Sequence, residues 1–157
     1  MADIEFGDIV QDNITGFKGV VTGRTESINI CDRITVQPQG LDKEGKVHDS
    51  MEFDVTSLTK IGHLEGHKTV KPKKQDIGLK DMVRSVITGF EGVATRRTIW
   101  SNGCVYYSVQ PLAKEEGSAL PKAIGFFDNE LEVTKKYEKP VEKRTTGGPP
   151  SAGQRLI

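Results

Sequence analysis

The sequence DIVQDNITGFKGVVTGRT at residues 8–25 returns as DMVRSVITGFEGVATRRT at residues 81–98. The match continues without a gap to Pro38 and Pro111 at a constant offset of 73 residues, and 16 of the 31 aligned positions are identical. So regular a repeat identifies a tandem duplication of one small module. The fold and the function therefore have to be understood from that module.

The repeat divides the 157 residues into two units of roughly 60 residues each. A unit of that size buries only about 60% of its unfolded surface, so packing of one unit against the other would stabilise both. We predict a first module at residues 3–62, a basic linker at 63–76, a second module at 77–134 and a flexible Pro/Gly-rich basic tail at 135–157.

The net charge is zero but unevenly spread. It is −5 over residues 1–62, +3 over 63–80, −2 over 81–134 and +4 over 135–157. Acidic modules joined by basic segments do not favour nucleic-acid binding through the folded surface. No apolar run approaches the roughly 20 residues of a membrane span and no signal peptide opens the chain, so we expect no membrane partner.

Short segments rich in β-branched residues alternate with glycine, asparagine and proline turns. In the first module they predict strands at residues 9–14, 17–26, 31–37 and 51–54. Asn102-Gly103 in the second module is a strong hairpin signal. No segment has the 3.6-residue period of a helix. The pattern predicts an all-β protein built from two tandem small barrels.

The pattern Gly-Asp-x-Val, Gly-Phe-x-Gly-x-Val and Val-x-Pro, which begins at Gly7, resembles SH3-like barrels, and its first hairpin resembles the KOW motif. The whole module is also similar to a family of short proteins encoded by tailed bacteriophages and bacteria. The shared signature is V-x-x-x-I-T-G-F-x-G-V-x-T-x-R-T, followed by N-x-C and V-Q-P. This resemblance implies two SH3-like barrels, a phage-type origin, and a location in the virion or the host cytoplasm.

The first copy departs from that signature at Ile30, where glycine is usual, and at Ser27-Ile28, where an aromatic residue is usual. The second copy keeps Trp100, Tyr106 and Tyr107. We therefore expect any site that needs an aromatic side chain to be better formed in the second copy.

Several polar residues recur that a hydrophobic core does not require. Asparagine at the turn is explained by turn geometry or by a site, and glutamine before proline by a backbone hydrogen bond or by a site. The repeated arginine needs either an internal carboxylate, for which Asp8, Asp54, Asp81 and Asp128 are candidates, or an external anion. The candidate binding residues are Arg24, Asn29, Gln37, Arg97, Trp100, Asn102, Tyr106, Tyr107 and Gln110.

Catalytic chemistry is poorly supplied. The three histidines lie outside the repeated signature, and the glycines around His63 and His67 argue against a helix that would bring those two rings together on a metal. The repeated glycines do not form a P-loop. Cys31 and Cys104 are expected to be small buried residues of their own modules. We expect no metal, no cofactor and no enzymatic activity.

The sequence thus favours a non-enzymatic binding protein that uses two barrels as platforms and the tail as an arm, with a protein partner or self-assembly. The alternative is a binder of a small nucleotide-like ligand, in which Arg97 would contact the anion and Trp100 would stack. Nucleic-acid binding through a KOW-like face is weakened by the charge pattern.

Overall fold

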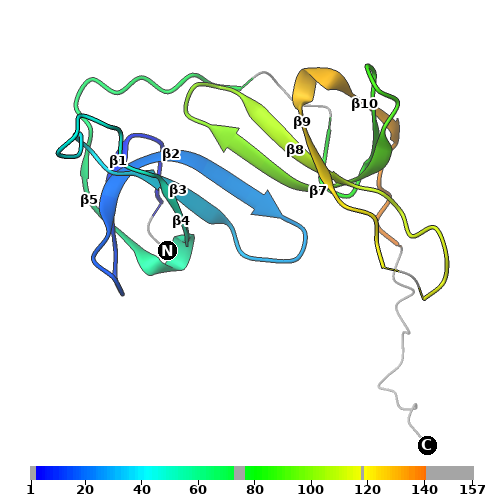
Figure 1. Ribbon diagram of the computed structural model, residues 1–157, viewed down its shortest axis with the longest axis horizontal. Coiled ribbons are helices and arrows are strands. Elements are labelled where there is room, and N and C mark those ends of the chain that lie inside the picture. The colour runs from blue at the N-terminus through cyan, green and yellow to red at the C-terminus, as the bar shows by residue number, and fades with distance from the viewer. Residues whose placement is uncertain (1–2, 73–76, 118, 141–157) are drawn as a thin grey trace, which may run out of the picture.

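The computed structural model describes residues 3–72, 77–117 and 119–140, and it is all-β (Figure 1). The first module contributes β1 (Asp8–Asp12), β2 (Lys18–Ser27), β3 (Arg33–Gln37), β4 (Met51–Asp54) and β5 (Leu58–His63). The second contributes β6 (Met82–Ser85), β7 (Glu91–Trp100), β8 (Val105–Gln110), β9 (Ile124–Phe127) and β10 (Leu131–Lys135). Short 3-10 turns, Val55–Ser57 and Asp128–Glu130, precede β5 and β10. No helix in these described ranges is long and apolar enough to cross a membrane.

The two modules repeat the same strand order, β5-β1-β2-β3-β4 and β10-β6-β7-β8-β9, with every pair antiparallel. Their β4 and β9 strands also keep the offset of 73 residues. The repeat therefore runs well beyond the 31 positions that are recognisable by identity. It makes Asp54 equivalent to Phe127, so the candidate carboxylates Asp54 and Asp128 do not occupy equivalent positions.

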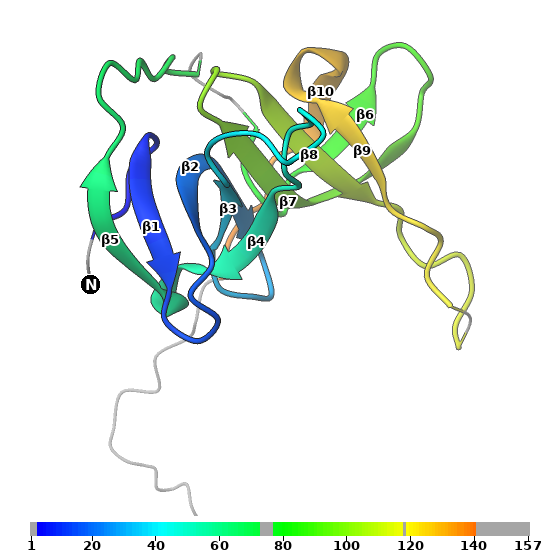
Figure 2. The same cartoon turned by 60° about the vertical axis from the view of Figure 1, so that its left-hand side comes forward.

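All ten strands belong to one open antiparallel sheet. Within the described residues β4 and β5 do not pair with each other, and neither do β9 and β10. Instead the last five residues of β2 pair with the last five of β7. The all-β class is confirmed, but the two modules share one sheet and neither is closed by strand pairing. In Figure 2 the two halves meet where β2 lies beside β7.

A local two-fold axis relates the modules where β2 meets β7. Thr25 pairs with Thr98, its own repeat equivalent, while Gly23 pairs with Trp100 and Ser27 with Arg96. The threonine hydroxyl oxygens lie 2.9 Å apart in a hydrogen bond. Antiparallel pairing of two equivalent strands about a dyad is the geometry of an isologous dimer interface. The duplicated chain contains that interface within one molecule.

Each module has its own hydrophobic core, built from equivalent positions. The first is formed by Ile4, Val10, Val21, Ile34, Val36 and Leu58. The second is formed by Ile77, Val83, Ala94, Val105, Tyr107, Val109, Phe126 and Leu131. Phe17 packs on Phe53 and Phe90 on Phe126 at ring distances of 5.3 and 5.6 Å, so the Phe of the signature is a core residue in both modules.

The second glycine of the Gly-Phe-x-Gly motif has a steric reason in both copies. A Cβ atom at Gly19 would lie 2.5 Å from the carbonyl oxygen of Gln37, and one at Gly92 would lie 2.5 Å from that of Gln110. The strands approach too closely there for any side chain.

The first part of the linker is placed by contacts with the modules. Up to residue 72 it is described, and the Val70 amide donates to the Ser101 carbonyl at 2.9 Å. The ring of His67 lies against Gly7, where an added Cβ would be 2.4 Å from His67 Cδ2. The linker thus contacts both modules. Residues 73–76, and residues 141–157 of the predicted tail, lie outside the described residues.

The hydroxyl pair on the two-fold axis can be tested by a double-mutant cycle. Thr25→Val and Thr98→Val should each lower the free energy of unfolding by about 1–3 kcal/mol, because each strands the other hydroxyl. The double variant should recover about 1 kcal/mol relative to the sum of the single costs in urea unfolding. Additive costs would contradict the pairing.

The matched control for this cycle is Thr35→Val. The Thr35 hydroxyl is buried and has no hydrogen-bond partner in the described part of the chain. Its removal should therefore be neutral or stabilising.

Candidate functional site: a cavity in the first module

The recurring glutamines tie a loop to the sheet. Gln37 Nε2 donates to the carbonyls of Pro38 at 3.3 Å and His48 at 2.7 Å. Gln110 Nε2 donates to Pro111 at 3.1 Å and to the equivalent carbonyl of Pro121 at 2.6 Å. The same bonds in both modules show that the backbone interpretation of this residue is right.

The recurring asparagine and cysteine belong to the hairpin turn. Asn102 Oδ1 accepts the Cys104 amide at 3.0 Å, and Gly103 adopts the left-handed conformation with φ of 89°. Asn29 lies exposed in the equivalent turn. Cys31 and Cys104 are both free and exposed, so the prediction that they are buried is wrong. They follow the turn and precede the strand that enters the core.

The recurring arginines form internal ion pairs, but with partners other than the expected ones. Arg24 donates through Nε and Nη2 to Asp32, with the shorter bond at 2.8 Å. Arg97 lies 3.0 Å from Glu26 of the other module. The repeat equivalents of Asp32 and Glu26 are Val105 and Ile99, so each copy has found its own carboxylate.

Asp8 and Asp81, the expected arginine partners, instead anchor the chain before β1 and β6. Asp8 accepts the Glu5 amide at 2.8 Å and lies 2.8 Å from His63 Nδ1. Asp81 accepts the Gly78 amide at 2.8 Å and lies 3.0 Å from Lys136 Nζ. Burial alone would raise the pKa of each carboxyl, but the hydrogen bonds and the nearby cations outweigh it and hold both pKa values below the ordinary range.

The aromatic residues of the second copy take three different roles. Trp100 lies over Gly23, where a Cβ would be 2.8 Å from its ring. Tyr106 is 38% exposed and packs edge-to-face on Phe127 at 5.0 Å. Tyr107 is fully buried. The second copy therefore does not gather its three aromatic side chains in one place.

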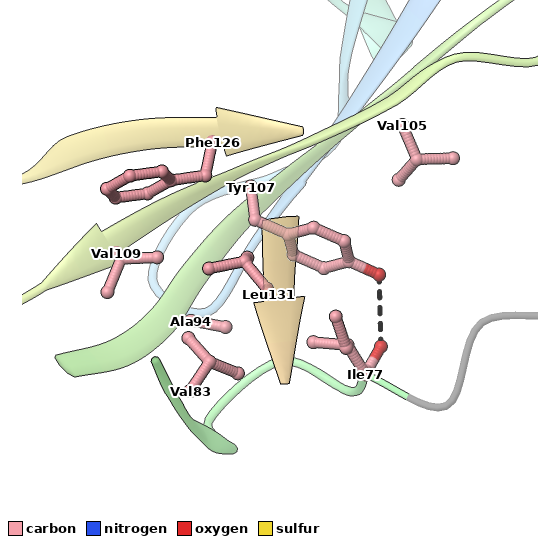
Figure 3. Close-up of a cluster of buried hydrophobic side chains, with 8 residues drawn as sticks. All are labelled: Ile77, Val83, Ala94, Val105, Tyr107, Val109, Phe126 and Leu131. Carbon is pink, nitrogen blue, oxygen red and sulfur yellow. Dashed lines mark hydrogen bonds between the residues drawn. The ribbon is translucent and has the colours of Figure 1, made fainter. Parts of the chain in front are cut away.

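The Tyr107 hydroxyl completes the core of the second module. It donates to the carbonyl of Ile77 at 3.1 Å (Figure 3), and Arg97 Nη1 lies 3.5 Å from the same oxygen. Burial raises the pKa of the Tyr107 phenol, which keeps it neutral as a donor. Burial opposes the Arg97 charge, but the contact with Tyr107 and the charge of Glu26 outweigh it, so the Arg97 pKa lies above its ordinary value.

The first module has a cavity at the corresponding place. Its volume is about 460 Å³, and its walls include Ile4, Val21, Arg24 and Ile34. These are the repeat equivalents of Ile77, Ala94, Arg97 and Tyr107. Because Ile34 has no phenol to reach the chain at Ile4, the space beside Arg24 is left open.

The rim of this cavity is polar. It is lined by His63 at the end of β5 and by His67, Thr69 and Lys71 of the linker, with Glu5 as its one carboxylate among the described lining residues. Arg24 Nη1 is the guanidinium nitrogen that Asp32 does not engage. The volume lies in the usual range for small-ligand sites, and the cationic side chains of Arg24 and Lys71 beside an apolar floor suit an anionic ligand.

Of the predicted binding residues only Arg24 lines this cavity. His63, His67 and Lys71 were missed because they do not recur in the second copy. The available signal was a difference between the copies: Ile34 stands where the second module has Tyr107. Among the described residues no three His, Cys, Asp or Glu side chains are placed to hold a metal ion.

Comparison with known proteins adds no identity to this geometry. No family model matches the chain, and no curated protein or solved structure matches it either. The candidate site therefore rests on the internal comparison of the two modules.

The lowered pKa of Asp81 predicts how stability depends on pH. The stabilisation is complete above the unfolded pKa of about 3.9 and is lost as the pH falls through the lower folded pKa. Asp81→Asn should cost about 1–3 kcal/mol at pH 7 and should flatten the profile below about pH 4. Urea unfolding from pH 2 to 7 measures both, and parallel profiles for the two proteins would contradict the assignment.

Proposed function

We propose that this protein is a non-enzymatic binding protein that takes a small anionic ligand in the cavity of its first module. The observation that carries the proposal is the opening between Ile4, Arg24 and Ile34, at a place that the second module fills with its own tyrosine. A nucleotide-like ligand, with a planar apolar body and a negative group, belongs to this class.

The chemistry of the lining supports binding of such a ligand. The walls formed by Ile4, Phe6, Val21 and Ile34 offer apolar contact to the body of a ligand. Arg24 and Lys71 offer charged donors to its anionic group. The Arg24 side chain is 35% exposed, so it is reachable and already oriented by Asp32.

The strand order and the sequence signature extend the proposal to the fold family and the origin of the protein. We propose that each five-stranded half is an SH3-like barrel in its strand order, left open between β4 and β5 in the first half and between β9 and β10 in the second. A phage-type origin, with action in the virion or the host cytoplasm, rests on the resemblance of the ITGF-x-G-V signature.

The fluorescent anion 8-anilinonaphthalene-1-sulfonate is a direct probe, since it joins an aromatic body to a sulfonate. The full chain should bind it saturably with one site per molecule. Arg24→Gln should weaken this binding about 10- to 100-fold, as expected for loss of a charge-assisted hydrogen bond of about 1.5–3 kcal/mol.

Arg33→Gln is the matched control. Arg33 also lies in the first module and pairs with the carboxylates of Glu52 and Asp54, but it does not line the cavity. Its binding should be unchanged. Equal effects of the two variants, or absence of saturable binding, would contradict the proposed site.

A second candidate function is binding to a protein, self-assembly included. It is favoured by the adjacent exposed rings of Tyr106 and Phe127, which lie 5.0 Å apart and of which Phe127 is 46% exposed. Exposed aromatic clusters of this kind are typical of protein contact surfaces.

Sedimentation velocity at rising protein concentration tests self-association through this surface. Phe127→Ser should lower the sedimentation coefficient at high concentration to that of the monomer. Ile87→Ser, which changes another exposed apolar residue, is the control. A wild-type chain that stays monomeric throughout, or equal effects of the two variants, would exclude self-assembly through these two rings.

A further inference from the structure

In the second module the Tyr107 phenol occupies the place that corresponds to the cavity of the first, and its hydroxyl donates to the Ile77 carbonyl. From it we infer that the cavity binds a hydroxyaryl anion, whose phenolic hydroxyl donates to the Ile4 carbonyl beside Arg24. This inference rests on the proposed binding function and adds the chemical class of the ligand.

The backbone that would accept the hydroxyl is built alike in both modules. The Glu5 amide donates to Asp8, and the Gly78 amide donates to Asp81, at 2.8 Å in each case. The same turns are closed by the amides of Asp8 and Asp81, which donate to the Glu5 and Gly78 carbonyls at 3.1 and 3.2 Å.

The third residue of this four-residue turn has a left-handed backbone in both copies. It is Gly7, with φ of 86°, in the first module and Lys80, with φ of 77°, in the second. The amide of Gly7 donates to Val21, and that of Lys80 donates to Ala94, on equivalent strands. The turn after Ile4 is therefore built like the turn after Ile77, and in the second module the Ile77 carbonyl accepts the Tyr107 hydroxyl.

The two arginines share their place on equivalent strands but differ in their carboxylate partners. Arg97 directs Nε and Nη2 to a carboxylate and Nη1 toward the Ile77 carbonyl, where the tyrosine hydroxyl arrives. Arg24 likewise commits Nε and Nη2 to a carboxylate. Its Nη1 takes no part in that ion pair, and Arg24 lines the cavity together with Ile4.

A ligand that enters from the rim would place its ring against Phe6 and Ile34 and its acidic group near His67 and Lys71. A phenol satisfies the carbonyl, whereas a second anion at that point would face the acceptor. The arrangement therefore favours one hydroxyl donor inside and one negative charge outside.

The binding of 4-hydroxyphenylacetate, phenylacetate and inorganic phosphate to the full chain, measured by calorimetry, tests this inference. The hydroxyaryl acid should bind once per chain. Phenylacetate should bind about 5-fold more weakly, as expected for loss of one hydrogen bond of about 1 kcal/mol.

The variant that fills the cavity from within is Ile34→Tyr. Its phenol should take the place of the ligand, abolish binding of 4-hydroxyphenylacetate and raise the melting temperature. Ile34→Val, which leaves the cavity open, should retain binding. Should Ile34→Tyr fail to fold, the ligand series with the unchanged chain still decides.

The outcomes separate the two proposals. Equal binding of 4-hydroxyphenylacetate and phenylacetate, weakened alike by Arg24→Gln, would overturn the hydroxyaryl inference and leave the anion site standing. Phosphate binding as tightly as the aromatic acids would do the same. Absence of binding by every probe, the fluorescent sulfonate included, would overturn both.

Discussion

The structure depends on one antiparallel strand pairing, that of β2 with β7. Five residue pairs and the bond between Thr25 and Thr98 join two modules that are each too small to bury much surface alone. Because the pairing is centred on equivalent residues, either module presents the same strand half to the other. The pairing uses the free edge that would otherwise be exposed to further strand addition.

Although the two modules are related by a two-fold axis, their equivalent arginines have different partners. A pair of identical modules would place each arginine opposite the same residue type, but here Arg97 meets Glu26 whereas Arg24 lies across from Ile99. Arg24 pairs with Asp32 of its own module instead. In the second copy Arg97 pairs with Glu26 across the junction, and Tyr107 is buried in the core. The first copy keeps its arginine beside an opening, which is why the proposed site lies in that copy.

Sequence patterns predicted the features that depend on neighbouring residues. The strands and the hairpin at Asn102-Gly103 follow from local chemistry and recur in both modules. Burial of Cys31 and Cys104 was predicted wrongly, because their repetition reflects a position beside the turn and not a place in the core. A single site formed by the three aromatic residues conflicts with the alternation of side chains along β8, where Tyr106 and Tyr107 point to opposite faces.

The sequence by itself determined that the chain is a duplication, that it is all-β, and where its turns fall, since these depend on periodicity and on residues with special backbone preferences. Only the tertiary structure decided that the modules share one sheet, that each arginine has a different carboxylate, and that the cavity lies in the first copy. Those outcomes depend on contacts between residues as many as 79 positions apart, such as the hydrogen bond from Ser101 to Thr22. The difference between Ile34 and Tyr107 is visible in the sequence, but its meaning depends on the carbonyl that the fold brings within reach of one side chain and not of the other.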